Sequence, residues 1–404
     1  MNAKIARRRF LAGAVAAAAA PTVIPASALG LDGRAAASNR IVMGGIGMGG
    51  RGTGVLNSFA NSPEVQVVAV CDVSARHRER AKQMFDNRYG NTDCRMYNDF
   101  REVNGRSDVD AVMIATPDHW HAIQAIDACR NGKDVFCEKP ETLTIREGQA
   151  MIAAARDYGR VFSGGSQRVW GDYNWFHRMV RGGAIGELRE IHVNVGGPAN
   201  VCNLPEEPIP EGLDWDLWLG PAPWAPFNRA RLNYRAWRDY SGGGMTDWGA
   251  HGFGGALFAA ELDDTGPVEI LPPDGGDVRH LTFVFANGVR MYHGGSKAGI
   301  LTFRGTEGEI CEHDRRRPAP NIVIPNYRGR GGINGDFLHC VKTRQLPFRD
   351  IAVAHRTVTV CHLGNIAYWL NRPIRWDPVR EEIIGDEQAS RWLSRPMRAP
   401  WTLA

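Results

Sequence analysis

The 404-residue sequence predicts an α/β protein with two parts. The N-terminal part is expected to form a doubly wound parallel sheet, because short apolar strands alternate with helical segments and a glycine-rich turn follows the first strand. The C-terminal part is expected to be an α+β domain with a mostly antiparallel sheet, because after about residue 165 strands follow one another with hairpin turns between them. The length is sufficient for two domains, each with its own core.

The N-terminus resembles a twin-arginine export signal. Consecutive arginines precede Phe10 and Leu11, an apolar, alanine-rich stretch extends to about Ala20, and small residues lie around Ala26 and Ala28. This order of charged, apolar and small residues is typical of a signal peptide, and the apolar run is too short for a membrane anchor. We therefore expect residues 1–37 to be a signal peptide and the protein to be periplasmic or secreted. The resemblance implies export of a protein that is already folded, with a cofactor bound.

The charge of the chain bears on its binding partners, and its cysteines bear on whether it forms disulfides. The formal net charge is +4, and the four basic residues Lys4, Arg7, Arg8 and Arg9 account for it, so that the remaining chain is close to neutral. No basic stripe favours nucleic acid as a partner. The eight cysteines include no C-x-x-C pair. An even number in an exported protein could form disulfides, but several cysteines fall inside apolar segments, which favours mostly free thiols.

The first strand and the turn after it predict a dinucleotide site. The apolar run at Ile41–Met43 ends in glycines, and a helix is expected from about Arg51. Glycines with the spacing G-x-G-x-x-G at such a junction allow a tight turn, a close approach of the backbone to a pyrophosphate, and close packing of helix on strand. The helix N-terminus would then bind the phosphates. The residues assigned to this site are Gly45, Ile46, Gly47, Met48 and Gly50.

Asp72 follows the second strand, VQVVAVC, and lies 22 residues after Gly50. At this position of a dinucleotide fold an acidic residue accepts the ribose 2′-hydroxyl, which favours NAD over NADP. Arg76 leaves NADP open as a second cofactor. The alternative is that Asp72 only caps the helix that begins after it.

Three further stretches fall at the carboxyl ends of parallel strands, where such sheets bind ligands. They are TPDHWH (116–121), EKP (138–140) and GSQRVW (165–170). Asp118, His119 and His121 could be taken for metal ligands, but no cysteine or carboxylate partner is evident, so no metal site is predicted. The residues assigned to the cofactor site here are Thr116, Pro117, His121, Glu138, Lys139 and Gln167.

The C-terminal part contains strand, hairpin and helix signals. A strand is expected at 188–197, a hairpin around Asn287 and Gly288, two more strands within 299–313, and helices at 335–348 and 352–373. Most of the 12 tryptophans follow residue 169. They could line a carbohydrate-binding surface or simply fill the core.

The stretch GGGMTDWGAH (242–251) places an aspartate and a histidine four residues apart. If it opens a helix, Asp247 and His251 share one face. They could be a catalytic pair, a metal site or an ordinary helix start.

The motifs GIGMGG, CDV, ATPDHWH and CEKP together resemble those of the Gfo/Idh/MocA oxidoreductases, which act on sugars and cyclitols. The resemblance extends from about residue 40 to 310. It implies an N-terminal Rossmann domain (38–164) and a C-terminal domain (165–404) whose large open sheet pairs subunits into a homodimer or homotetramer. It also implies an NAD(P)-dependent oxidoreductase acting on a secondary hydroxyl or ketone of a sugar, glycoside or cyclitol, without a metal. The alternative on the same scaffold is a glycoside hydrolase that uses bound NAD for transient oxidation and elimination.

In this family a lysine of EKP and a histidine of a later D-x-x-x-H helix face the nicotinamide and the substrate hydroxyl. The matching residues here are Lys139, Asp247 and His251. Histidine can accept the hydroxyl proton, and a lysine cation can stabilise the developing alkoxide. Asp247 could either hold His251 in position or bind a second substrate hydroxyl. The family often has a carboxylate three residues after the histidine, and Gly254 at that position predicts a substrate that differs from the usual ones.

Overall fold

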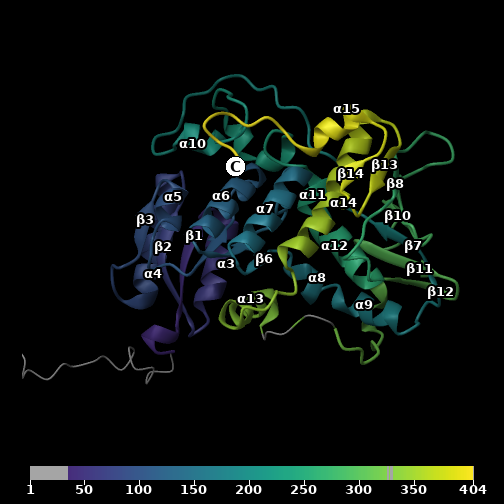
Figure 1. The fold of residues 1–404 in the computed structure, drawn as a ribbon, viewed down its shortest axis with the longest axis horizontal. Coiled ribbons are helices and arrows are strands. Elements are labelled where there is room, and N and C mark those ends of the chain that lie inside the picture. The colour runs from purple at the N-terminus through teal and green to yellow at the C-terminus, as the bar shows by residue number, and fades with distance from the viewer. Residues whose placement is uncertain (1–34, 325–326, 328–330, 404) are drawn as a thin grey trace, which may run out of the picture.

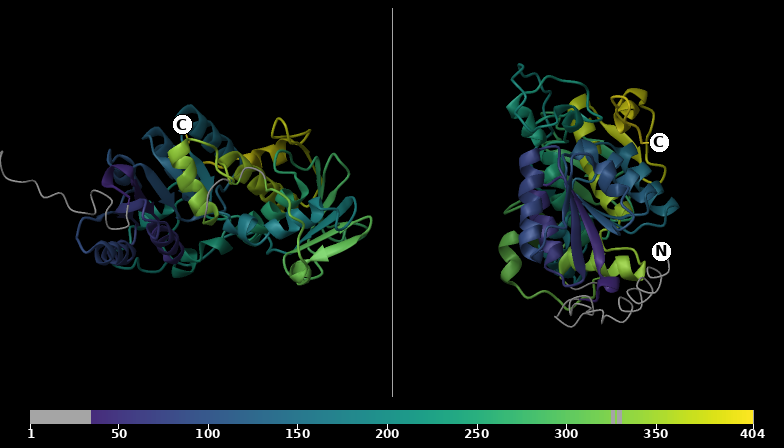
Figure 2. Two further views of the ribbon diagram at one scale, coloured as in Figure 1. Left: turned by 90° about the horizontal axis from the view of Figure 1, so that it is seen from below. Right: turned by 90° about the vertical axis from the view of Figure 1, so that its left-hand side faces the viewer.

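The computed structural model describes residues 35–324, 327 and 331–403, so nearly all of the predicted export signal lies outside the described residues. Two sheets occupy opposite halves of the described chain, and helices lie between and around them (Figure 1). The left view of Figure 2 shows that the halves form the two ends of an elongated molecule, and the right view looks along its length from the N-terminal half. Among the described residues, no helix is long and apolar enough to cross a membrane.

The N-terminal sheet has six parallel strands in the order β3-β2-β1-β4-β5-β6. This order confirms the prediction of a doubly wound sheet, with its direction of winding reversing between β1 and β4. The third strand was not predicted, because two of its three residues are exposed and it lacks an apolar pattern. The strands are β1 (Ile41–Ile46), β2 (Val65–Cys71), β3 (Arg95–Tyr97), β4 (Ala111–Ile114), β5 (Asp134–Cys137) and β6 (Phe162–Gly164).

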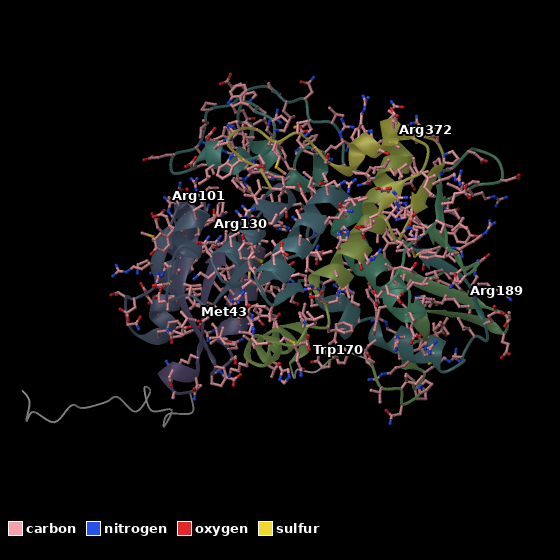
Figure 3. All side chains as sticks on the ribbon, viewed as in Figure 1. Met43, Arg101, Arg130, Trp170, Arg189 and Arg372 are labelled. Carbon is pink, nitrogen blue, oxygen red and sulfur yellow. The ribbon has the colours of Figure 1, made fainter. Side chains whose placement is uncertain are left out.

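Helices cover both faces of this sheet through two apolar clusters. One cluster joins the sheet to α3, α4 and α13, and the other joins it to α5, α6 and α7. Met43, labelled in Figure 3, points from β1 into the first cluster and is fully buried. The helices are α3 (Gly50–Ala60), α4 (Ala75–Tyr89), α5 (Phe100–Asn104), α6 (Asp118–Arg130), α7 (Ile145–Asp157) and α13 (Gly332–Thr343).

The C-terminal sheet has eight strands in the order β12-β11-β7-β10-β9-β8-β13-β14. All neighbouring pairs are antiparallel except β7 with β10, which confirms a mostly antiparallel sheet. The predicted hairpin at Asn287 and Gly288 joins β9 to β10. Arg189 of β7 lies at the end of the molecule opposite the first sheet (Figure 3). The strands are β7 (Leu188–Val193), β8 (Glu269–Leu271), β9 (Leu281–Val284), β10 (Arg290–His293), β11 (Leu301–Gly305), β12 (Gly308–Cys311), β13 (Ile374–Asp377) and β14 (Glu382–Ile383).

A long helix and the chain end connect the two halves. Helix α14 contacts α7 and β6 on one side and α11 and α12 on the other, and Figure 1 shows it between the two sheets. The last residues return to the first half, where the ring of Trp401 packs against Trp120 at a centroid distance of 4.7 Å. The helices of the second half are α8 (Gln167–Gly171), α9 (Asn174–Arg181), α10 (Trp215–Leu219), α11 (Gly244–Asp247), α12 (Gly249–Ala260), α14 (Ile351–Leu370) and α15 (Glu387–Ser390).

All eight cysteines are unpaired, and all but Cys202 are buried. This confirms the prediction of mostly free thiols. Buried thiols of this kind pack as small apolar side chains, and burial raises the pKa of Cys94 and Cys129 to about 12.

In the glycine-rich loop, the glycines that make close contacts are not all those that the sequence predicted. Strand β1 continues through Gly45 to Ile46, so the turn begins at Gly47, which has a φ of +83° and would place a Cβ 2.7 Å from the backbone of Ala115. A Cβ on Gly52 would lie 1.8 Å from the Gly47 carbonyl oxygen, whereas one on Gly50 would contact nothing within 4 Å. The helix therefore packs on the loop through Gly52, and the assignment of this role to Gly50 was wrong.

Replacing a glycine of α3 by alanine is expected to change stability in opposite directions at two positions. We expect Gly52→Ala to destabilise the N-terminal half by about 3 kcal/mol or more, because the added methyl collides with backbone. We expect Gly54→Ala to stabilise it by about 0.5–1 kcal/mol, because position 54 is exposed and open and alanine has the higher helix propensity. Chemical unfolding of the cofactor-free protein measures both, and equal midpoints for the two variants would contradict the packing described here.

Candidate active site

A cavity of about 610 Å³ opens at the carboxyl ends of β1, β2 and β4. One wall comes from the glycine-rich loop, the end of β2 and the β4–α6 connection. The opposite wall comes from the C-terminal half, through residues between 210 and 234. Because ligands of doubly wound sheets bind where the strand order reverses, this cavity is the candidate dinucleotide site. The residues that the C-terminal half contributes are Pro210, Glu211, Leu213, Leu217, Trp218, Leu232 and Tyr234.

Asp72 lies in this cavity at the end of β2. One carboxylate oxygen accepts a hydrogen bond from the backbone of Met48 at 2.7 Å, and the other accepts one from the backbone of Ser74 at 2.8 Å. The residue at the N-cap of α4 is Ser74, so the alternative that Asp72 is the cap is wrong. The other predicted cofactor residues that line the cavity are Ile46, Gly47, Thr116 and Pro117.

The remaining predicted cofactor residues do not line this cavity. Met48 is fully buried, and only its backbone reaches Asp72. His121 is buried, and its two ring nitrogens lie 2.8 Å from the carbonyl oxygens of Thr116 and Pro140, so it ties the loop after β4 to the loop after β5. Burial lowers the pKa of His121 to about 4. Glu138 and Gln167 both accept hydrogen bonds from Arg51.

Lys139 and Asp247 form an ion pair between the two halves of the chain. The lysine follows β5, and the aspartate ends α11. Lys139 Nζ lies 2.6 Å from Asp247 Oδ1 and also donates to the Asp247 backbone oxygen at 2.8 Å. Arg235 Nε donates to the same Oδ1 at 2.9 Å. Burial acts to raise the pKa of Asp247, but the two cations outweigh it and hold this pKa below its ordinary value.

Asp247 and His251 do not share one uninterrupted helix. Helix α11 ends at Asp247 and α12 begins at Gly249, with Trp248 between them. The Asp247 carboxylate bonds Lys139 and Arg235, whereas His251 Nδ1 lies 2.8 Å from Ser166 Oγ. The first of the two predicted roles of Asp247, holding His251 in position, is therefore wrong. Ser166 has that role.

The surroundings of His251 keep its imidazole neutral. The ring is buried, and burial together with the cations of Lys139 and Arg168 lowers its pKa to about 3. Ser166 Oγ also lies 3.1 Å from the carbonyl oxygen of Ala250, which can only accept a hydrogen bond. When the hydroxyl donates to that carbonyl, Oγ is left to accept from Nδ1–H. The lone pair of His251 is then on Nε2, which is the form a general base requires.

Two family descriptions cover most of the chain. Residues 40–166 match the oxidoreductase family described as an NAD-binding Rossmann fold, and residues 198–403 match its C-terminal alpha/beta domain. The chain belongs to the Gfo/Idh/MocA oxidoreductase family. Its N-terminal domain is therefore an NAD-binding Rossmann domain, and the glycine backbone and the carboxylate of Asp72 in the cavity fit the pyrophosphate and ribose of NAD.

Individual relatives match shorter parts of the chain. Inositol 2-dehydrogenase of Salmonella typhimurium is 30% identical over 171 residues, which are 42% of this chain and 48% of that protein. A glycosyl hydrolase family 109 protein of Saccharopolyspora erythraea is 38% identical over 134 residues, which are 32% of this chain and 29% of that protein. The chain thus matches about half the length of the first relative and less than a third of the second.

The fold is shared with solved structures over nearly their whole length. The structure of aldose-aldose oxidoreductase from Caulobacter crescentus aligns with a TM-score of 0.57 and 20% identity, covering 83% of this chain and 99% of that one. At this identity the likeness shows a common fold.

Gly254 does not face the site that the family resemblance suggested. A Cβ at this position would contact Val169 at 3.1 Å and Thr357 at 3.2 Å, in the interior beside α12. The glycine allows these elements to approach one another, and a Cβ here would point at side chains of the interior. The prediction that Gly254 marks an unusual substrate is therefore not supported by the geometry.

The side chains of the DHWH stretch are buried in the interior. His119 Nε2 lies 3.0 Å from the Trp218 carbonyl oxygen, and Asp118 accepts a hydrogen bond from Ser241 at 2.6 Å. Burial raises the pKa of Asp118 to about 7 and lowers that of His119 to about 4. Within the described residues, no group of three or more histidine, cysteine, aspartate or glutamate side chains is placed so that it could hold a metal ion.

Three residues of the centre were missed by the sequence analysis. Ser166 lies in the GSQRVW stretch that the strand pattern selected, but nothing singled it out. Arg235 lies in the aperiodic segment 198–240, where no pattern indicated a functional residue. Trp248 was read only as part of the motif; its side chain is 42% exposed, its ring is 5.9 Å from that of His251, and Arg168 lies over it at 5.0 Å.

The low pKa of His251 gives a prediction for pH dependence. Because the folded-state pKa lies near 3, the imidazole stays neutral as the pH falls through 6.5, and catalysis should not decline there for lack of the base. We expect Lys139→Met to raise the pKa of His251 towards its ordinary value, since a neighbouring cation is removed. Hydrogen–deuterium exchange at the imidazole carbon, followed by mass spectrometry, measures this pKa.

Lys342→Met is the matched control, because Lys342 pairs with Glu64 at the surface. A wild-type His251 that titrates near 6.5, or a pKa that Lys139→Met leaves unchanged, would contradict the electrostatic account.

Proposed function

We propose that this protein is an exported oxidoreductase that transfers a hydride between NAD and a secondary carbinol carbon of a sugar, glycoside or cyclitol. The observation that carries the proposal is the convergence of Lys139 from the NAD-binding domain with Asp247 and His251 from the second domain. We also propose that copies of the chain pair through the open face of the second sheet, as the family resemblance implies.

The residues of the centre have separate tasks in this proposal. His251 Nε2 accepts the hydroxyl proton of the substrate, while Ser166 holds the ring through Nδ1. Lys139 stabilises the developing alkoxide, and Asp247 fixes the position of its ammonium group. NAD, when bound, accepts the hydride. The ion pair is largely buried, and the low dielectric of such surroundings strengthens its field.

We propose further that NAD is bound tightly and recycled between substrates, because an exported enzyme has no supply of free cofactor to depend on. The construction of the cavity supports this. The segment that forms its second wall is tied to the β2–α4 connection by backbone hydrogen bonds from Ala75 to Gly212 at 2.8 Å and from Asp214 to Val73 at 3.0 Å. A bound dinucleotide would be enclosed between the two halves.

A second candidate function is glycoside hydrolysis, favoured by the 38% identity to a glycosyl hydrolase family 109 protein. Transient oxidation of one carbon would acidify the adjacent C–H bond, so that neutral His251 could remove that proton and the glycosidic bond could break by elimination. Addition of water to the resulting double bond would complete the hydrolysis, and return of the hydride would restore NAD, with no net reduction. The same residues serve both reactions.

Turnover measurements distinguish these functions. We expect sugars or cyclitols to reduce the cofactor that copurifies with the protein, and we expect Lys139→Met and His251→Asn each to slow this step by ~100-fold or more. Lys342→Met should retain the wild-type rate. Wild-type rates in both site variants would contradict the proposed centre. Cleavage of a chromogenic glycoside without net formation of reduced cofactor would favour the hydrolase over the dehydrogenase.

Retention of the cofactor can be tested at the second wall of the cavity. Leu232 lines the cavity and is 40% exposed, so we expect Leu232→Ser to accelerate cofactor loss ~3- to 10-fold through lost apolar contact. Leu346→Ser is the control, since Leu346 is an exposed leucine outside the cavity. Mass spectrometry of the cofactor released after timed dialysis measures the rate, and equal rates in the two variants would contradict retention by this wall.

A further inference from the structure

Arg235 occupies the catalytic centre but uses only part of its hydrogen-bonding capacity. Its Nε donates to Asp247 Oδ1 at 2.9 Å, and within the part of the chain that the structure describes its two terminal NH₂ groups have no hydrogen-bond partner. The side chain is 43% exposed, so these groups can reach a molecule bound beside Asp247. A guanidinium edge with two parallel N–H donors matches the geometry of a carboxylate.

The guanidinium is held in place before any substrate binds. It lies over the ring of Tyr234 at 4.6 Å, and its Nε is anchored on Asp247. Tyr234 and Arg235 both belong to the short 3-10 helix η3 (Tyr234–Ala236). Because the side chain is already restrained, little conformational entropy is lost when its free edge binds a ligand.

The charges of the centre leave an excess of positive charge. Lys139 and Arg235 are both paired with the single carboxylate of Asp247. The other cations near His251 have their own partners, Arg51 with Glu138 and Arg168 with Asp172. Asp118, a further carboxyl group whose charge acts on Arg235, is buried, and burial disfavours its ionised form. An anion bound at the free edge of Arg235 would balance the remaining charge.

We propose that Arg235 determines substrate specificity and that the substrate is a sugar acid or a related polyol acid. Its carboxylate would pair with the two terminal nitrogens of Arg235, while a secondary hydroxyl on the same molecule lies at His251. This rests on the proposed function, because it assigns the substrate class of the same centre. The competing role, in which Arg235 only orients Asp247, would affect charged and neutral substrates alike.

The test compares acids with their neutral amides on the protein as purified with its cofactor. The probes are glucuronate, galacturonate and gluconate, each against the corresponding amide and the parent aldose or polyol. Both kcat/KM and the dissociation constant from calorimetry are measured for wild type, Arg235→Gln and Arg235→Lys. Arg229→Gln is the matched control, because Arg229 lies on the same segment and its exposed side chain has no hydrogen bond within the described residues.

We expect the wild type to prefer at least one acid over its amide by ~10-fold or more. Arg235→Gln should lower kcat/KM for the acid by ~10- to 100-fold and leave the amide within ~3-fold, so that the preference disappears. Arg235→Lys should restore part of it, because the charge remains while the forked geometry is lost. Arg229→Gln should behave as wild type.

The other outcomes separate this inference from the proposed function. Equal losses for acid and amide in Arg235→Gln would assign only a positioning role to Arg235 and overturn the inference. Oxidation of neutral sugars without any preference for acids would also overturn it, while leaving the proposed function intact. Acids that bind more tightly than their amides, lose this advantage in Arg235→Gln and yet are not oxidised would support carboxylate binding by Arg235 and contradict the proposed function.

Discussion

The ion pair between Lys139 and Asp247 joins the two halves of this protein at the point where its chemistry is proposed to occur. Its partners lie 108 residues apart in the chain, one after the fifth strand of the NAD-binding domain and the other at the end of α11. Both side chains are largely buried, so the pair must offset the cost of removing two charges from water. It does so through additional bonds, one from Lys139 to the Asp247 backbone and one from Arg235 to the Asp247 carboxylate.

The same charges set the protonation of His251. The cations that keep Asp247 ionised act together with burial to keep the imidazole neutral. A neutral histidine beside a lysine cation is the combination that removal of a hydroxyl proton and stabilisation of an alkoxide require. Ser166, from the loop after β6, orients the ring, so the proposed base is positioned by a residue that directly follows the last strand of the first sheet.

The tryptophans of the C-terminal half have two different roles. Trp215 and Trp218 stack at a centroid distance of 4.7 Å and form a small core with Phe227 and Tyr240, as core-filling residues would. That core holds the second wall of the cofactor cavity against the NAD-binding domain. Trp248, outside this core and next to Asp247, is the tryptophan whose exposed ring adjoins His251.

The sequence by itself determined the strand–helix alternation, the family and most of the residues that come together, because these depend on local pattern and on motifs of fixed spacing. Lys139 and His251 are examples: each lies in a short motif that can be read without knowing what faces it. Only the tertiary structure decided the partners, since burial and distance depend on segments remote in the chain. It assigned Asp247 to Lys139 rather than to His251, replaced Gly50 by Gly52 as the packing glycine, turned Gly254 into the interior, and brought Arg235 into the centre from a segment without periodicity. Contacts between segments that are remote in the chain form only on folding, so no local sequence pattern predicts them.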